Sequence, residues 1–299
     1  MSASRERMID IGHRTLFTRS IDGDSAPVFM LHGVGASHTT WNEVPALLAA
    51  VGIGSVAIDL PGHGASSKGE GEYTIESFAE SAIAVLDELG IDRVHLVGHS
   101  LGGGVSLQLV HRWPQRFVSL TLASSGGLGS RVGRPLRAIS LPGADLVLRG
   151  ISDRRAVAGA TWIGQRLNRL GVESVLVREG TLDSLSGYAD EGQRHAFLTT
   201  LRHVVDHRGQ RANGLEALVG LDASRVLITW GARDGVLPIA HGERAHALLP
   251  GSRFEVFSES GHLPHQDDPG RFAVAVADLV RTVGDAGCVR AESDLADAG

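Results

Sequence analysis

Three residues whose types could together perform nucleophilic catalysis occur in this chain in the order serine, aspartate, histidine. Ser100, Asp234 and His262 each come directly after a short apolar run that is typical of a buried strand. A serine hydroxyl becomes an effective nucleophile when a histidine takes its proton and a carboxylate orients that histidine. The pattern therefore predicts Ser100 as the nucleophile, His262 as the general base and Asp234 as the orienting acid.

The segment around Ser100 predicts how the serine is presented. Residues 94–104 read as a strand, a turn of the form Gly-x-Ser-x-Gly, and the start of a helix. Small neighbours allow strand and helix to pack closely while the serine takes a strained backbone. The helix start directs free N–H groups at an oxyanion. We expect the N–H of Leu101 and the N–H of Val34, which follows Gly33 in another glycine-rich turn, to hold that oxyanion.

Strands and helices alternate on both sides of these residues. Strands are predicted at 8–13, 16–21, 28–31, 55–59, 94–98, 117–123, 226–230 and 253–257, and helices at 41–51, 73–89, 105–113, 239–249 and 269–283. Short connections between buried strands and amphipathic helices are typical of a parallel sheet. The sequence therefore predicts an α/β fold, with a mostly parallel twisted sheet and helices on both faces.

The alternation stops between residues 128 and 220. This segment shows helical patterns at 136–149, 156–170 and 195–206 but no buried strand. We expect a core formed by residues 1–127 and 221–283, a helical cap at 128–220, and a disordered polar tail at 284–299. An independent helical domain is the alternative for the inserted segment. Candidate substrate-binding residues are Trp162 in the cap and Gly33, His99 and Leu263 near the predicted catalytic residues.

Several further polar residues are predicted to have structural or lining roles. His32 and His63 stand in glycine-rich loops and are expected to pin loop to loop, whereas His38 and His265, like His99, could line the pocket. Asp59 ends a strand just before a Pro-Gly-His-Gly turn, whose backbone N–H groups would occupy its carboxylate. We therefore favour Asp234 over Asp59 as the partner of His262.

Composition excludes some classes of function. The 299 residues carry a formal net charge of −6, and no run of lysine and arginine offers a path for nucleic acid. A single cysteine excludes an intrachain disulfide and fits a reducing compartment. The first residues lack the apolar segment of a signal peptide, and no window of about eighteen apolar residues predicts a membrane span. We expect a cytoplasmic protein with a small-molecule substrate, no nucleic-acid partner and no membrane partner.

Five motifs together carry a resemblance to a known family. They are His32-Gly33-Val34-Gly35, Asp59-Leu60-Pro61-Gly62-His63-Gly64-Ala65-Ser66, Gly98-His99-Ser100-Leu101-Gly102-Gly103, Trp230-Gly231-Ala232-Arg233-Asp234 and Gly261-His262. The chain resembles the α/β-hydrolase fold family, in its serine-nucleophile branch with a cap, over roughly residues 10–125 and 215–283. The resemblance implies an eight-stranded, mostly parallel sheet, a helical cap after strand six, no metal and no organic cofactor.

Departures from particular branches of the family narrow the reaction. Members that act on epoxides or carbon–halogen bonds carry aspartate as nucleophile, and Ser100 argues against both. Meta-cleavage-product hydrolases usually have Asn before the nucleophile and Trp after the histidine, where this chain has His99 and Leu263.

We therefore expect a serine-dependent hydrolase that cleaves a small to medium, largely apolar carbonyl compound, most simply a carboxylic ester, through an acyl-enzyme. One alternative is a carbon–carbon bond hydrolase of vinylogous diketones, or an acyltransferase that uses the same residues. Another is a receptor that only binds a ligand in its capped pocket, and repeated turnover separates an enzyme from such a receptor.

Overall fold

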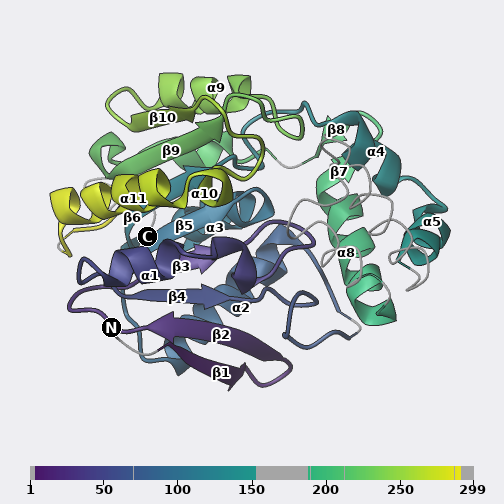
Figure 1. Ribbon diagram of the computed structural model, residues 1–299, viewed down its shortest axis with the longest axis horizontal. Helices are drawn as coiled ribbons and strands as arrows, with labels where there is room; N and C mark the ends of the chain where they lie inside the picture. Colours follow the sequence, from purple (N-terminus) through teal and green to yellow (C-terminus); the bar gives the residue numbers. More distant parts are fainter. Residues whose placement is uncertain are drawn as a thin grey trace, which may run out of the picture.

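An eight-stranded sheet forms the centre of the molecule in the computed structural model, which describes residues 4–69, 71–152, 188, 190–211, 213–285 and 287–290 (Figure 1). The strands are β1 (Arg5–Asp10), β2 (Thr15–Ile21), β3 (Val28–Leu31), β4 (Ser55–Ile58), β5 (Val94–His99), β6 (Phe117–Ala123), β9 (Val226–Gly231) and β10 (Arg253–Phe257). Their order across the sheet is β1-β2-β4-β3-β5-β6-β9-β10.

The sheet is mostly parallel. β1 pairs antiparallel with β2, and β2 with β4, whereas all other neighbouring strands pair parallel. Every residue of β3, β4, β5, β6 and β9 is buried. Strands buried on both faces read as continuous apolar runs, which is why the sequence located them within one or two residues. The predicted fold class is confirmed.

Helices cover both faces of this sheet. They are α1 (Val44–Ala49), α2 (Ile75–Glu88), α3 (Leu101–Arg112), α9 (Ala240–Leu248), α10 (Pro264–Asp267) and α11 (Pro269–Val283), with 3-10 turns η1 (His38–Trp41), η2 (Pro114–Arg116), η4 (Leu215–Leu218) and η5 (Ala223–Arg225). α1 packs on α11 at one face, and α2 packs on α3 at the other. α11 begins where the sequence predicts, because the Asp268 side chain accepts the N–H of Arg271 and caps it.

The chain between β6 and β9 forms α4 (Arg134–Ser140), α5 (Ala144–Ile151), α8 (Glu191–Val204) and a small antiparallel pair, β7 (Val205–Asp206) with β8 (Gly209–Gln210). Figure 1 shows these elements grouped at one end of the molecule, apart from α1 and α11. Among the residues that the structure describes, no helix is long and apolar enough to cross a membrane.

The predicted single helix at 136–149 is wrong, because two helices meet there at a break. Pro142 lacks the N–H that a helix needs, and Gly143 adopts a left-handed φ of 89° before α5 begins. The short pair β7–β8 was also not predicted. The predicted helix at 156–170, Trp162 included, lies outside the described residues, as does most of the tail at 284–299.

Candidate active site

Ser100 sits at a sharp turn between β5 and α3. Its φ of 53° and ψ of −114° place a non-glycine residue in a region that costs conformational energy. The glycines on either side make this turn possible by removing side chains from crowded positions. A Cβ at Gly98 would overlap Ser106 Oγ and the carbonyl of Gly102, and a Cβ at Gly102 would overlap the carbonyl of Leu31. The turn therefore lifts the Ser100 hydroxyl clear of the sheet.

The structure brings the side chains of Ser100, His262 and Asp234 together. His262 Nε2 lies 3.0 Å from Ser100 Oγ, and His262 Nδ1 lies 2.8 Å from Asp234 Oδ2. A carboxylate can only accept, so Nδ1 carries the proton and donates to Asp234. The neutral ring then presents a bare Nε2 that accepts the hydrogen bond from the Ser100 hydroxyl. This is the tautomer that a general base for Ser100 requires.

Asp234 is held on both of its oxygens. Oδ1 accepts the backbone N–H groups of Val236 and Leu237, at 2.8 and 2.9 Å, while Oδ2 faces His262. The carboxylate is fully buried, and the His262 side chain is 16% exposed. Hydrogen bonds from the loop after β9 therefore compensate the burial of the Asp234 charge and fix its direction. These two loop donors were not predicted.

The sequence predicts the N–H groups of Leu101 and Val34 as the donors of an oxyanion hole. Leu101 opens α3, so its N–H is one of the groups at a helix start that have no acceptor within the helix. Val34 stands in the turn after β3, in which Ala36 N–H donates to Gly33 O at 3.2 Å and Gly35 takes a left-handed φ of 73°. Both residues line the same cavity as Ser100.

Among the residues that the structure describes, the side chains that line this cavity are mostly apolar and come from the core and from α4, α8 and β7. The lining residues are Val34, Ile75, Ser100, Leu101, Gly126, Gly127, Val132, Leu136, Leu201, Val204, Val205, Gln210, Val236 and Leu237. Both polar atoms of the Gln210 amide are hydrogen-bonded within the protein. Its Oε1 accepts Gly127 N–H at 2.9 Å, and its Nε2 donates to Gly129 O at 2.6 Å. The Ser100 hydroxyl therefore lies at the wall of an apolar cavity.

Three of the other candidate substrate-binding residues do not line this cavity, and the fourth cannot be placed. Gly33, His99 and Leu263 are not part of the cavity lining, and Trp162 is outside the described residues. His99 is buried, and its Nε2 lies 2.8 Å from the carbonyl oxygen of His262. Leu263 is half-buried at the start of α10.

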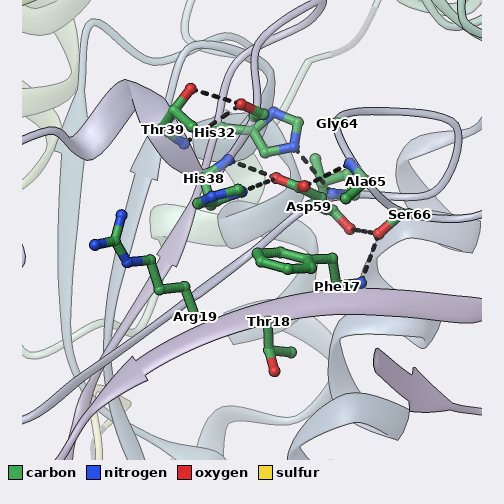
Figure 2. A network of polar contacts seen from close by, with 12 residues as sticks. Phe17, Thr18, Arg19, His32, His38, Thr39, Asp59, Gly64, Ala65 and Ser66 are labelled. Atoms are coloured by element: carbon green, nitrogen blue, oxygen red, sulfur yellow. Dashed lines mark hydrogen bonds and ion pairs between the residues drawn. The ribbon is translucent and has the colours of Figure 1, made fainter. Parts of the chain in front are cut away.

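The carboxylate of Asp59 is used by loops and not by His262. Figure 2 shows it between His38 and Ala65. Oδ1 accepts the backbone N–H of His38 at 2.5 Å and His38 Nδ1 at 2.9 Å, and Oδ2 accepts the N–H of Ala65 at 2.8 Å. Burial by itself would raise the pKa of Asp59, but the hydrogen bond from the His38 ring and the other donors lower it. The sequence suggested that His38 could line the pocket. Instead, His38 contacts Asp59 and does not line the cavity.

Two further histidines sit in the loops as structural groups. His32 pins two loops together, because its Nε2 accepts Leu60 N–H at 2.9 Å and its Nδ1 donates to Gly33 O at 2.8 Å. His63 Nδ1 lies 3.0 Å from the Pro61 carbonyl oxygen, its ring packs against the rings of His32 and Phe78, and burial lowers its pKa to about 3.

His265 is buried next to His99, and its Nε2 lies 3.0 Å from Thr40 Oγ1. It does not line the cavity either. Within the described part of the chain, no group of three or more His, Cys, Asp or Glu residues could hold a metal ion.

Comparisons with known proteins show the family to which the chain belongs. A family model described as the alpha/beta hydrolase fold matches residues 26–269. A protein of Mycobacterium tuberculosis described as uncharacterized is 38% identical over 270 residues, which are 87% of this chain and 76% of that protein. The dihydrolipoyllysine-residue acetyltransferase component of the acetoin cleaving system of Cupriavidus necator is 30% identical over 262 residues, covering 87% of this chain and 65% of that protein.

The arrangement of the elements is also similar to a solved structure. The 2-hydroxy-6-oxo-6-phenylhexa-2,4-dienoate hydrolase of a Rhodococcus species superposes with a TM-score of 0.71 at 21% sequence identity, over 94% of this chain and 100% of that one. At this level of identity the likeness extends to the fold alone.

Proposed function

Because the chain belongs to the α/β-hydrolase fold family, we propose that it is a serine-dependent hydrolase of small to medium, largely apolar carboxylic esters. One observation carries the proposal: the hydrogen-bonded chain Ser100 Oγ, His262 Nε2, His262 Nδ1 and Asp234 Oδ2, with distances of 3.0 and 2.8 Å, at the wall of an apolar cavity. These are the hydrogen-bond distances expected between a nucleophile, its general base and the group that orients the base.

In the proposed reaction, Ser100 Oγ attacks the ester carbonyl carbon while its proton passes to His262 Nε2. The negative charge that forms on the carbonyl oxygen is held by the N–H groups of Leu101 and Val34. Collapse of the tetrahedral species breaks the bond to the alcohol oxygen, which receives the proton from His262. Water then attacks the acyl-Ser100 with His262 as base, and the acid and free Ser100 are released. Asp234 keeps the His262 tautomer and stabilises the imidazolium.

The substrate class follows from the cavity wall. Apolar side chains surround Ser100, and burying an apolar group against them contributes roughly 25 cal/mol per Å² of apolar surface. An acyl or alkoxy group without charge fits this wall best. Leu136 of α4 and Leu201 and Val204 of α8 belong to the segment at 128–220, so we propose that this segment acts as a cap that selects the substrate.

Acyl transfer is the second candidate, favoured by the 30% identity with an acetyltransferase component. The acyl-Ser100 would then be released by a thiol or alcohol acceptor instead of water. Carbon–carbon bond hydrolysis and simple ligand binding remain alternatives that the same assay separates.

The test is a panel of p-nitrophenyl esters of increasing acyl length, run beside a vinylogous diketone and read as kcat/KM, with and without a thiol acceptor. We expect repeated turnover of the esters, faster than of the diketone, with free acid as product. Preference for the diketone would overturn the ester proposal. Transfer of most acyl groups to the thiol would favour the acyltransferase, and binding without turnover would indicate a receptor.

A further inference from the structure

His99 joins the two loops that carry the proposed nucleophile and base. It immediately precedes Ser100, and its Nε2 lies 2.8 Å from the main-chain carbonyl oxygen of His262. A carbonyl oxygen only accepts, so Nε2 of His99 must carry the proton and donate it to this bond. Consecutive residues therefore bind the same histidine: Ser100 contacts the ring of His262, and His99 contacts its backbone.

The His99 ring also contacts the loop of the proposed oxyanion donor Val34. A Cβ at Gly33 would lie 2.9 Å from His99 Nδ1, so the ring packs directly on the Gly33 backbone. On the other side, the ring centroid of His265 lies 4.6 Å away and that of His262 lies 4.9 Å away. The imidazole of His99 is thus fixed between the loops that bear Ser100, Val34 and His262.

The surroundings of His99 keep its ring neutral. Burial, together with the nearby His265 and His262, holds the pKa of His99 well below its usual value. A neutral ring carries one N–H, and the bond to His262 uses it. His99 therefore adds no positive charge beside His262, which itself becomes an imidazolium during the proposed reaction.

The main chain on both sides of His262 has bonds of its own, and after His262 the carbonyl oxygen of Leu263 accepts the N–H groups of Gln266 and Asp267 at 2.9 Å. Ser260 O accepts Arg233 N–H at 3.0 Å, and Gly261 N–H donates to Asp267 Oδ2 at 3.0 Å, so the residues before His262 are held. At His262 itself the ring is bound by Ser100 and Asp234, and the main chain by His99.

We propose that His99 is a positioning residue, which holds the backbone of His262 at the distance that lets its ring reach Ser100 and Asp234 together. This inference rests on the proposed function, because it assigns His99 to the geometry of that same reaction. It differs from a substrate-binding role, since His99 does not line the cavity.

Two amide substitutions test the bond. In His99→Gln the side-chain N–H₂ reaches about as far as the Nε2 of histidine, whereas in His99→Asn the same amide is one methylene shorter. We expect His99→Gln to keep kcat within about threefold. His99→Asn should lower kcat by roughly 30- to 100-fold with KM within about twofold, because a misplaced base slows the chemical step without weakening substrate binding.

His265→Asn is the matched control, because it shortens an equally buried neighbouring imidazole that makes no bond to His262. We expect it to lower Tm but to keep kcat within about threefold, which is the size of an indirect packing effect. Equal kcat values for His99→Gln and His99→Asn would overturn the inference. So would a loss in His265→Asn as large as that in His99→Asn.

A measurement on the unmodified protein covers the case in which the variants do not fold. Nitrogen-15 NMR of the histidine side chains should show His99 as the neutral Nε2–H tautomer at pH 7. A protonated His99 ring, or an Nδ1–H tautomer, would overturn the inference. Absence of ester turnover and of Ser100 acylation in the wild type would instead defeat the proposed function. Retained kcat in a folded His99→Asn, beside an active wild type, would defeat only the role of His99.

Discussion

Asp234 and His262 come from the loops after two neighbouring parallel strands, β9 and β10, and meet at 2.8 Å between Oδ2 and Nδ1. The second aspartate that follows a strand at this edge, Asp59, has its carboxylate occupied by His38 and Ala65. The two carboxylates therefore have different partners, although both side chains are buried and both residues follow a strand.

Asp234→Asn should lower kcat by disturbing the tautomer of His262. The amide keeps the shape of the side chain, but its N–H₂ group competes for the position that should accept the His262 proton and favours the wrong tautomer. The corresponding change in a serine protease costs about 10⁴ in kcat, and we expect a loss of the same order here. Steady-state kinetics on a p-nitrophenyl ester, with circular dichroism to verify folding, would measure it.

Asp59→Asn is the matched comparison. Its carboxylate accepts three hydrogen bonds from the loops, so the substitution should lower Tm while kcat stays within about tenfold, since each lost bond costs about 1 kcal/mol of stability. If the folded Asp59 variant lost as much kcat as the Asp234 variant, the assignment of the orienting acid to Asp234 would be wrong.

Ser100 should be the residue that reacts covalently. An alkyl fluorophosphonate should add to Ser100 Oγ, and peptide mass mapping should locate the adduct. Ser100→Ala should lower kcat by about 10⁴- to 10⁶-fold, as removal of a nucleophile does in serine enzymes. Labelling of a different serine in active protein would contradict the role of Ser100.

The sequence predicted well the strands and strand-end residues whose signal lies within a short stretch of the chain. Buried strands such as β3, β6 and β9 were located because a run of apolar residues ended at a glycine or polar turn. Asp234 and His262 could be paired because consecutive strands usually lie side by side. The break at Pro142–Gly143 carries an equally local signal, and two helices should have been predicted there.

Contacts that depend on the order of the strands could not be predicted in this way. His38 follows β3 and Asp59 follows β4, and they meet because these strands are neighbours in the sheet. Likewise, the bond from His99 to His262 joins loops 163 residues apart in the chain. The cap residues at the cavity, Leu136 and Leu201, depend on how helices pack, which no periodicity in the sequence fixes.

Gly102, two residues after the proposed nucleophile, should not tolerate a side chain, whereas Gly104 in the same helix should. A Cβ at Gly102 would overlap the backbone carbonyl of Leu31, whereas a Cβ at Gly104 would meet Ile75 Cδ1 at an ordinary 3.5 Å. We expect Gly104→Ala to raise stability by about 0.5–1 kcal/mol, because alanine loses less backbone entropy in a helix.

Gly102→Ala should instead lower stability by roughly 2–4 kcal/mol or prevent folding, because overpacking against a backbone cannot be relieved by a rotamer change. Urea unfolding of the two variants measures both effects. A Gly102 variant as stable as the Gly104 variant would refute the close packing of α3 on the sheet.

Substrate preference should change with the cap residues that reach the cavity. Leu136 of α4 lines it, whereas Leu146 of α5 is 73% exposed. Leu136→Ala should enlarge the cavity and shift the ranking of esters toward longer acyl chains, by up to about tenfold in relative kcat/KM per added methylene group that it accommodates. Leu146→Ala, the matched control, should leave the ranking unchanged. An unaltered ranking in Leu136→Ala would argue against the cap as the selective element.

Stability should fall steeply in mildly acidic solution because buried histidines cannot take up protons. Burial lowers the pKa of His63 and of His265 to about 3, against about 6.5 for a histidine in an unfolded chain. Between pH 6.5 and pH 3 the unfolded state binds more protons than the folded state, so the free energy of unfolding decreases as pH falls. The loss from pH 7 to pH 5 should be about 2 kcal/mol for each of the two residues.

Substitution of one of these histidines isolates its share of the pH dependence. His63→Asn keeps a side-chain N–H near the position of Nδ1, which faces the Pro61 carbonyl, but removes the titrating ring. Urea unfolding at pH 7, 6 and 5 should therefore show a dependence that is smaller by about 2 kcal/mol than in the wild type. Leu146→Ala, which removes no titrating group from an exposed position, should leave the dependence unchanged. If His63→Asn lost stability with falling pH as steeply as the wild type, His63 would have to take up its proton in the folded state, and burial would not be keeping its ring neutral.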